Sequence, residues 1–467
     1  MSHNTGLPLV SPASPPSLDP AFRPAVLANR AFRKAAQATG RAVPVAFALE
    51  RSASSVSRFE TMVAPPDSPT ASGNLRYLER LLKFLLWSRG AGKVHFAGPL
   101  ELGHQLQRHF EQTTTGRFDA EIMGMKIYDR PFEVAITTMA GLPAERETTA
   151  PLGRHWNGCR IGFDLGASDQ KVAAVQDGKV VFSDEFPWDP RPQTDPQWHF
   201  DCIMRTLKEA AKHLPRVDAI GGSSAGVYVN NLVKVASLFR GVPEEQFKAR
   251  IKNLFHDIQR AWGGIPVEVV NDGEVTALAG AMSLNQNAVL GVALGSSQAA
   301  GYVNREGQIT SWLNELAFAP VDYSASAAVD EWSGDYGCGV QYFSQQGVSR
   351  LIPLSSLPVE AKLPLPEKLI VVQQAMAKGD ERAARIYQSI GVYLGYTLAH
   401  YREFYDFSHL LLLGRVTTGE GGNLIVQRAR KVLATEFPEL AITIHMPDEK
   451  EKRHGQAMAA ASLPVVP

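Results

Sequence analysis

The stretch IGFDLGASDQK, Ile161–Lys171, decides the fold expected for this chain of 467 residues. It opens as an apolar strand, passes through Asp164 and continues into the small residues Gly166, Ala167 and Ser168. Backbone N–H groups in such a turn can approach phosphate oxygens closely, because no large side chain obstructs them. A carboxylate where a strand ends is well placed to hold hydrated Mg²⁺. The stretch therefore indicates a phosphate-binding turn, and an ordinary tight turn is the alternative.

Strands and helices alternate from this stretch to the end of the chain. Two more strands, QKVAAVQ and GKVVFSDEF, follow with a turn at Asp177-Gly178, and then the order is helix, strand, helix, strand. A second, similar passage begins at Ala288, and the chain closes with an alanine-rich helix near residues 455–462. This order indicates an α/β fold with a mixed sheet.

Two further turns of small residues follow apolar strands in the second passage. They are LGSSQAAG, Leu294–Gly301, and GRVTTGEGG, Gly414–Gly422. The hydroxyls of Ser296 and Ser297 are additional donors for a phosphate. Each turn alone has the same ordinary alternative, so the case for a phosphate site is cumulative.

The segment VEVVNDGEVTALAGAM contains a strand that ends on Asn271 and Asp272, just before a helix that starts near Glu274. In α/β sheets, ligands lie at the carboxyl ends of the strands. Asp272 is either the N-cap of the helix or a base that accepts the proton of a substrate hydroxyl while Asn271 orients the substrate. Both interpretations stay open at this point.

In their order and spacing these segments resemble the ROK family of bacterial sugar kinases and sugar-responsive repressors, within the superfamily of actin, heat-shock chaperone ATPases and sugar kinases. DLGASDQKVAAV is similar to the family's first phosphate motif, and VNDGEVTALAGA to the strand with its Asn-Asp pair. GSSQAAGYV resembles its second phosphate loop, GRVTTGEGG its adenosine loop and GQAMAAAS its closing helix. The resemblance runs from Arg160 to the C-terminus, about two thirds of the chain.

The resemblance implies an α/β protein with the two-lobed actin-like ATPase (ribonuclease H-like) fold and an additional α+β N-terminal subdomain. It implies ATP-dependent phosphorylation of a sugar or sugar-derivative hydroxyl, with Asp272 as general base and Asp164 positioning Mg²⁺-ATP. The nucleotide-binding residues that it implies are Gly166, Ala167, Ser168, Lys171, Gly295, Ser296, Ser297, Gly414, Gly419 and Gly421. The implied substrate-binding residues are Asn271 and Glu315, with Asn230 and Asn231 as further candidates.

The sequence departs from the family at the sugar end. Where many members have Glu-x-Gly-His, this chain keeps Glu315 but has Phe318 in place of the histidine. The family's cysteine-rich zinc loop corresponds to 330–346, which holds Cys338 alone, so we predict no structural zinc. The family's Gly-Thr-Gly is Gly295-Ser296-Ser297 here. These changes favour one alternative to a kinase, a weak or inactive protein that senses a sugar or nucleotide.

Two groups of residues near the expected sugar pocket have competing interpretations. Asn230 and Asn231 could bind substrate hydroxyls, although such a pair more often marks a plain turn. The aromatic residues of 312–342 could stack on a sugar, but packing explains most clusters of this kind.

The N-terminal third is predicted to be a mostly irregular extension, 1–74, followed by a small α+β subdomain, 75–158. The kinase lobes are expected at 159–275, together with the C-terminal helix 450–467, and at 276–449. Within the subdomain, Ala120–Asp129 and Phe132–Met139 read as two strands. A strand separates the two visible helices and no third helix precedes these strands, which argues against a DNA-binding winged helix.

Composition excludes several other classes. The formal net charge is zero, so there is no electrostatic case for nucleic-acid binding. Three scattered cysteines do not form a disulfide framework. No apolar run is long enough to span a membrane, and a signal pattern is missing, so we expect a cytoplasmic protein. A homodimer suits the family, and the Asn-Asp pair argues against an ATPase that acts on a protein client.

Overall fold

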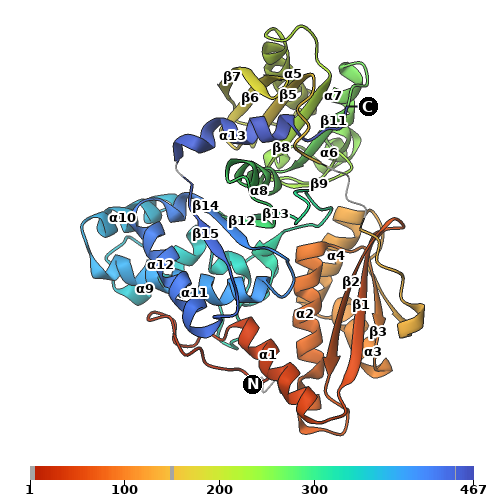
Figure 1. Ribbon diagram of the computed structural model, residues 1–467, viewed down its shortest axis with the longest axis vertical. Coiled ribbons are helices and arrows are strands. Elements are labelled where there is room, and N and C mark those ends of the chain that lie inside the picture. The colour runs from red at the N-terminus through yellow and green to blue at the C-terminus, as the bar shows by residue number, and fades with distance from the viewer. Residues whose placement is uncertain (1–5, 148–151, 448, 467) are drawn as a thin grey trace.

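The computed structural model describes residues 6–147, 152–447 and 449–466, with only the backbone for 449–454. It has three parts (Figure 1): an N-terminal module, and two lobes that are joined by helix α8. Within the described residues, no helix combines the length and the apolar character that a membrane crossing requires.

The N-terminal module is built on one sheet with the strand order β2-β1-β3-β4. β1 pairs antiparallel with β2 and β3, and β4 joins β3 in parallel. Its main elements in chain order are α1 Ala25–Ala38, β1 Val43–Ser52, β2 Ser55–Val63, α2 Asn74–Arg89, β3 Lys93–Ala97, α3 Leu100–Gln112, α4 Thr114–Glu121 and β4 Glu133–Thr137.

Residues 120–128 are helical, and the prediction of a strand over 120–129 is wrong. α4 continues into a π-helical turn, η2 Ile122–Tyr128. Met123 and Ile127 are both fully buried and four residues apart, so they share one helical face. The segment has the apolar content of a strand, but its buried positions follow the helical period.

The predicted division at residue 74 falls inside this module. β1 and β2 come from the segment predicted to be mostly irregular, 1–74, and they share a sheet with β3 of the predicted subdomain, 75–158. The irregular description is correct only for the stretch before α1, of which residues 1–5 lie outside the described residues. The other limits of the predicted domains stay predictions.

Lobe 1 is a five-stranded sheet with the order β11-β8-β5-β6-β7. β5, β8 and β11 run parallel, and β6 and β7 continue from β5 as antiparallel hairpins, as the sequence predicted. α13 returns from the C-terminus and packs so closely that a Cβ on Gly162 would overlap the backbone of the helix. The elements are β5 Cys159–Leu165, β6 Asp169–Gln176, β7 Lys179–Pro187, α5 Pro196–Ala211, β8 Ala219–Ser224, β9 Val227–Val229, β10 Leu232–Val235, α6 Glu244–Ala249, α7 Leu254–Ala261, β11 Val267–Asn271 and α13 Glu449–Ala461.

Lobe 2 is a four-stranded sheet with the order β13-β12-β14-β15 and a group of helices beside it (Figure 1). β12, β14 and β15 are parallel, and β13 is antiparallel to β12. α8 leads into this lobe and packs on β13. The elements are α8 Asp272–Ser283, β12 Val289–Leu294, β13 Gln298–Val303, α9 Gln345–Ser355, α10 Leu365–Ala377, α11 Glu381–Tyr401, β14 His409–Leu413, α12 Glu420–Glu436 and β15 Thr443–His445.

The N-terminal module and lobe 2 share one hydrophobic core. Phe84 of α2 stacks on Phe404, with ring centroids 4.1 Å apart. The extended segment before α1 lies on lobe 2, where Phe22 is fully buried against Tyr393. Because α2 faces its own sheet on one side and lobe 2 on the other, nearly all of its residues are buried, including the charged residues Glu79, Arg80, Lys83 and Arg89.

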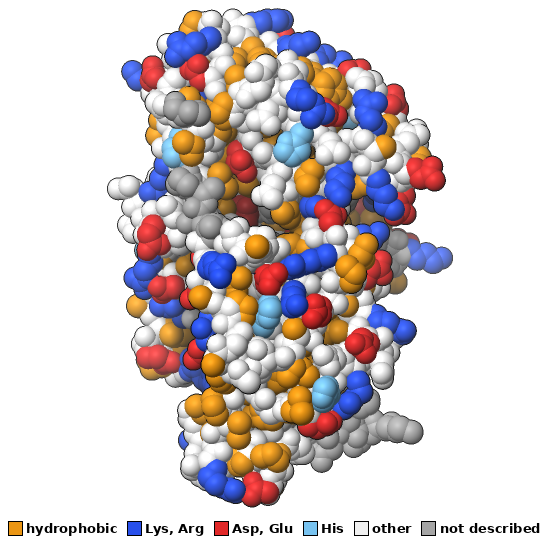
Figure 2. Space-filling model, turned by 90° about the vertical axis from the view of Figure 1, so that its right-hand side faces the viewer, with side chains coloured by type: hydrophobic (Ala, Val, Ile, Leu, Met, Phe, Trp, Pro, Cys, Tyr) orange, Lys and Arg blue, Asp and Glu red, His pale blue; other side chains and the backbone are white. Residues whose placement is uncertain are grey.

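The module also contacts lobe 1. Asp129, at the end of the π-helical turn, forms ion pairs with Lys234 of β10 at 2.6 Å and with Lys252 at 2.9 Å. The N-terminal module therefore touches both lobes. A side view shows a hollow in the surface below lobe 1, with acidic side chains inside it (Figure 2).

Candidate active site

Parallel pairing in lobe 1 brings Asp164 and Asn271-Asp272 to one edge of the sheet. In the register of β5, β8 and β11, Asp164 is opposite Ser223 and Asn271 is opposite Ser224. Ser223 Oγ donates a 2.6 Å hydrogen bond to Asp164 Oδ1. Asp164 is only 6% exposed, and burial raises the pKa of its carboxyl group, although the bond from Ser223 opposes the rise.

The N-cap of α8 is Asn271, so Asp272 is not the N-cap, and its role as a base stays a prediction. Asn271 Oδ1 accepts a 2.7 Å hydrogen bond from the N–H of Gly273, and its Nδ2 donates to the carbonyl oxygen of Gly226 at 2.7 Å. The amide is thus engaged on both sides within the protein, and its role toward a substrate remains a prediction. Asp272 follows as the first helical residue, and its carboxylate accepts one 2.9 Å bond, from Gly273.

Asp272 lies where β11 of lobe 1 passes into α8, Glu315 lies in lobe 2, and the two carboxyl groups interact electrostatically. Burial raises the pKa of Asp272 to about 6, and the charge of Asp164 adds to the rise. Burial raises the pKa of Glu315 to about 7, with a further contribution from Asp272. The two buried carboxyl groups therefore lie close enough for their charges to interact, and they and their surroundings are called the acidic recess below.

Glu274 is a third carboxyl group of this recess, and no sequence motif had pointed to it. Glu274 lies in the first turn of α8 and is 8% exposed, and Asn314 Nδ2 lies 3.3 Å from its Oε1. Burial raises the pKa of Glu274 to about 8, although Asn314 opposes the rise and Glu315 adds to it. Glu274 belongs to the VNDGE segment, but its partner Asn314 is far away in the sequence, so no local pattern indicates that the two meet.

These pKa values predict a pH profile. If Asp272 is the base, it must be ionised to accept a proton, so kcat/KM for the substrate is expected to fall about tenfold per pH unit below a midpoint near 6. A pH series of initial rates measures it, with Asp184→Asn, a change at an exposed carboxylate of β7, as the control. A flat profile between about pH 5 and 8 would contradict the role of Asp272.

The same pKa shifts determine the direction in which the stability of the fold changes with pH. The folded-state pKa values of Asp272, Glu274 and Glu315 lie above their ordinary values, so the folded state binds protons more tightly than the unfolded chain. The contribution of these groups to the free energy of unfolding therefore grows as pH falls from about 8 toward about 5.

The first predicted phosphate turn is braced by a tryptophan that the sequence analysis did not identify. Trp188 N–H donates to the carbonyl oxygen of Ser168 at 3.1 Å, and its Nε1 donates to that of Gly166 at 2.9 Å. Lys171 pairs with Asp169 at 3.3 Å. The turn, which also contains Ala167, is thus held in shape, while binding of a phosphate by its residues remains a prediction.

The second and third predicted loops lie next to each other. β12 and β14 are parallel neighbours, so the turns at Gly295 and Gly414 leave the same edge of the sheet. The N–H of Gly295 donates to Ser297 at 2.9 Å, and the carbonyl oxygen of Gly295 accepts from Gln345 at the start of α9. Ser296 lies between Gly295 and Ser297 in the turn.

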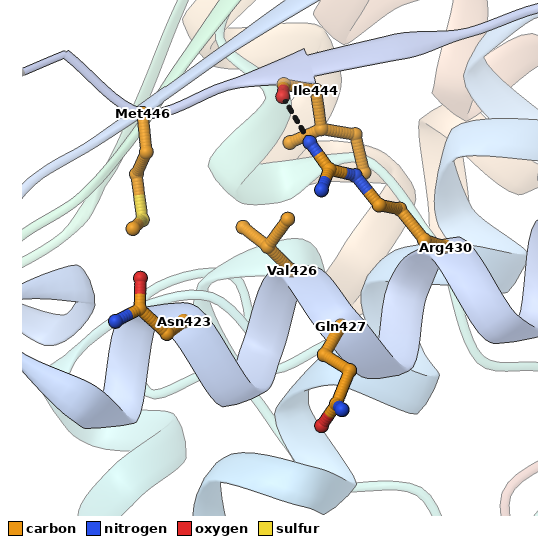
Figure 3. A pocket seen from close by; sticks show the side chains of 6 residues that line it. All are labelled: Asn423, Val426, Gln427, Arg430, Ile444 and Met446. Atoms are coloured by element: carbon orange, nitrogen blue, oxygen red, sulfur yellow. Dashed lines mark hydrogen bonds between the residues drawn. The ribbon is translucent and has the colours of Figure 1, made fainter.

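A surface hollow of about 510 Å³ lies beside the third loop (Figure 3). One of its lining residues, Asn423, lies near the start of α12 and comes just after Gly419 and Gly421 in the sequence. Arg430 closes it by donating to the carbonyl oxygen of Ile444 at 2.8 Å. The full lining is Asn423, Val426, Gln427, Arg430, Ile444 and Met446.

Replacing Gly414 by Ala is expected to weaken nucleotide binding more than carbohydrate binding. Gly414 has φ of 97°, and a Cβ there would collide with the carbonyl oxygen of Leu294, so the two adjacent loops would be forced apart. The Kd for an ATP analogue should rise about tenfold or more, while that for a carbohydrate changes less than about twofold. Calorimetric titration measures both, with Gly379→Ala as control, because Gly379 also has positive φ but has open space around it. An unchanged nucleotide Kd would contradict the assignment of this loop.

The asparagine pair marks a turn, as the alternative interpretation held. Asn230 and Asn231 both have positive φ, 51° and 60°, at the tip of the β9–β10 hairpin. Asn231 Nδ2 donates to the carbonyl oxygen of Val267 at 2.8 Å, and its Oδ1 accepts from the N–H of Val269 at 2.7 Å. Its amide therefore binds the hairpin to β11 and is not directed to the recess. The side chain of Asn230 is exposed, and the structure does not bring it to Asp272.

The 330–346 segment contains a buried thiol. Cys338 is fully buried, and its Sγ lies 3.9 Å from the carbonyl oxygen of Asp335. Over the described ranges, no three or more His, Cys, Asp or Glu side chains are placed to hold a metal ion. The prediction that the chain has no structural zinc stays a prediction. For Mg²⁺ carried by a nucleotide, Asp164 is the carboxylate that fits, because a single protein hydrogen bond leaves its other oxygen available.

Two α/β lobes joined by a helix define the class of actin-like ATPase folds, and the sugar kinases of the ROK family share this particular fold. The ROK hexokinase from Thermus thermophilus superposes with a TM-score of 0.51 at 16% identity, over 65% of this chain and 96% of that chain. A ROK family transcriptional regulator, a homologue of the E. coli MLC protein, superposes with a TM-score of 0.51 at 19% identity, over 69% of this chain and 82% of that chain. Neither a family model nor a curated protein sequence matches this chain. At these identities the likeness shows the fold.

Proposed function

We propose that the protein transfers the γ-phosphoryl group of ATP to a hydroxyl of a sugar or sugar derivative. The observation that carries the proposal is the position of Asp272 at the start of α8, with a pKa of about 6 and with Glu315 of lobe 2 near it. A general base works best when its pKa lies near the working pH. The sugar-kinase fold supports the same reaction class.

In the proposed reaction, the substrate hydroxyl lies against Asp272 and Glu315. Asp272 accepts the hydroxyl proton while the oxygen forms a bond to the γ-phosphorus, and the bond to the bridging oxygen breaks, with its electron pair leaving on ADP. Magnesium bound with the nucleotide neutralises phosphate charge, and Asp164 is the residue for its hydrated shell. The turns at Gly166 and Gly295 hold the phosphates through backbone N–H groups. Positioning supplies most of the rate.

A second candidate function is a sensor that binds a sugar or nucleotide with little or no turnover. Ser297 places a side chain in the turn after β12, and Phe318 packs against Trp87 with ring centroids 4.3 Å apart, where a histidine would serve a sugar. A ROK transcriptional regulator shares the fold.

A coupled assay of ADP release distinguishes the two functions. Purified protein is supplied with MgATP and a panel of hexoses, amino sugars and polyols. The kinase proposal expects at least one carbohydrate to raise ADP release well above the rate with ATP alone. If none does so but one raises the melting temperature, the sensor function replaces it.

We also infer a cytoplasmic location, because the proposed reaction consumes ATP. A homodimer is the oligomeric state that we propose, and sedimentation analysis tests it.

A further inference from the structure

We propose that helix α2 of the N-terminal module forms one side of the active site, and that Trp87 of this helix is a positioning residue that holds Glu315 toward the substrate. This inference rests on the proposed function, because it assigns Glu315 to carbohydrate binding. It assigns a role in the active site to the N-terminal module, which lies outside the two lobes.

The main-chain contacts are the first observation. The N–H of Glu315 donates to the carbonyl oxygen of Trp87 at 2.9 Å, and the N–H of Asn314 donates to that of Ser88 at 2.9 Å. The last carbonyl groups of a helix have no partner within the helix. The C-terminal turn of α2 therefore binds directly to the two residues that face α8, Glu315 through its charge and Asn314 through its bond to Glu274.

The side chain of Trp87 provides a second attachment. It is 2% exposed, its ring packs on Phe318 at a centroid distance of 4.3 Å, and its Nε1 donates to Asp119 Oδ1 at 2.9 Å. Phe318 lies three residues after Glu315, at the end of a short 3₁₀ turn. Trp87 thus fixes both ends of the segment 315–318, one through its carbonyl group and the other through its ring.

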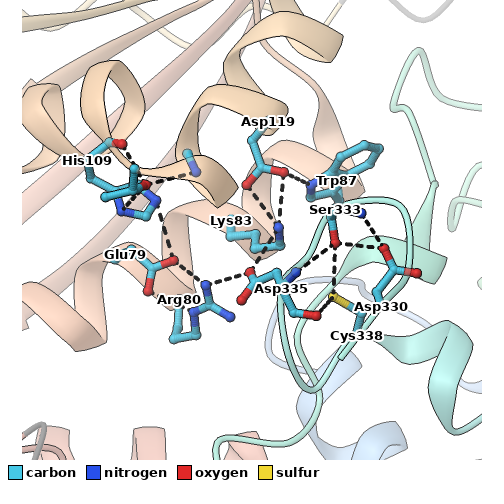
Figure 4. A network of polar contacts seen from close by, with 12 residues as sticks. Glu79, Arg80, Lys83, Trp87, His109, Asp119, Asp330, Ser333, Asp335 and Cys338 are labelled. Carbon is cyan, nitrogen blue, oxygen red and sulfur yellow. Dashed lines mark hydrogen bonds and ion pairs between the residues drawn. The ribbon is translucent and has the colours of Figure 1, made fainter. Parts of the chain in front are cut away.

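A buried ion network provides a third attachment (Figure 4). Lys83 Nζ lies 3.0 Å from carboxylate oxygens of both Asp119 and Asp335, and Arg80 Nη2 lies 2.7 Å from Asp335 Oδ2. All four side chains are at most 2% exposed. Burial alone would raise the pKa of Asp335, but Arg80 and Lys83 outweigh it and hold that pKa below its usual range.

This network extends to the segment that carries Glu315. Cys338 Sγ lies 3.9 Å from the carbonyl oxygen of Asp335, and the N–H of Gly339 donates to the carbonyl oxygen of Ala319 at 3.0 Å. The loop 333–339 is therefore anchored on α2 at one end and bound to the residues after Phe318 at the other. Three attachments, all from one helix and partly linked through Asp119, converge on the same short segment of lobe 2.

Replacement of Trp87 tests the proposal. Trp87→Ala removes the ring contact and the bond to Asp119, whereas Trp87→Phe keeps a ring against Phe318. We expect Trp87→Ala to raise KM for the carbohydrate about tenfold or more, with KM for ATP changed less than about twofold, and Trp87→Phe to restore most of the loss. Trp332→Ala is the control, because Trp332 belongs to the neighbouring loop but is 74% exposed.

Hydrogen–deuterium exchange of the peptide that covers 311–318 supplies a readout that does not need turnover. The amides of Asn314 and Glu315 should lose protection in Trp87→Ala and keep it in Trp332→Ala, in protein that melts above the assay temperature. Unchanged protection, or KM values for carbohydrate and ATP that rise equally, would overturn the positioning role. A wild-type protein that neither turns over nor binds any carbohydrate would instead refute the proposed function and, with it, this inference.

Discussion

Replacing Asp272 by Asn is expected to reduce carbohydrate-dependent ADP release by about 10²–10⁴-fold in kcat. The amide has nearly the same shape as the carboxylate but cannot accept the hydroxyl proton. Asn271 remains as the N-cap of α8, so the helix and the fold should persist. Steady-state kinetics at about pH 7.5, above the pKa near 6, measure the loss with the wild-type base ionised.

Two comparisons make this result specific. Glu360→Gln removes one negative charge from an exposed position and should leave kcat within about twofold of wild type. The burial of Asp272 destabilises its charge, so Asp272→Asn should melt at the same temperature as wild type or above it. If Asp272→Asn keeps more than about a tenth of the wild-type kcat, Asp272 is not the base.

Replacing Lys83 by Met is expected to lower the free energy of unfolding by about 3–5 kcal/mol. The lysine is 1% exposed between Asp119 and Asp335, and its removal leaves Asp119 with only the indole N–H of Trp87. A buried carboxylate without a cation is costly, because water cannot replace the lost partner. Urea unfolding followed by circular dichroism gives the difference between variant and wild type.

Lys212→Met is the matched control for this change. Lys212 also pairs with a carboxylate, Glu209 at 2.6 Å, but on the surface, where its side chain is 66% exposed. The control should differ from wild type by less than about 0.5 kcal/mol. Equal effects of the two lysine replacements would show that the network does not stabilise the junction between the N-terminal module and lobe 2.

The parts of the fold that the sequence predicted depend on local pattern. β5, β6 and β7 follow from short apolar runs separated by turn residues, and their places in the chain agree with the structure. The carboxyl end of β11 was expected to hold a functional pair, and Asp272 lies there. Local sequence could not decide whether Asp272 or Asn271 caps α8, because either side chain can accept the bond from Gly273.

The parts that the sequence did not predict depend on contacts between distant residues. Arg80 and Lys83 of α2 look like an ordinary solvated helix face, and only the position of Asp335 in lobe 2 explains their burial. Glu315 was identified as a candidate, but its attachment to Trp87 crosses from the N-terminal module to lobe 2. Such pairs leave no periodic pattern in one sequence.

The most direct test of the account is ³¹P NMR of a reaction that contains the protein, MgATP and the carbohydrate that most raises ADP release. If the protein is the kinase that we propose, a phosphate monoester signal grows as fast as ADP forms, and Asp272→Asn suppresses both. If ATP yields only inorganic phosphate, or if no carbohydrate in the panel yields a monoester, the central claim is wrong.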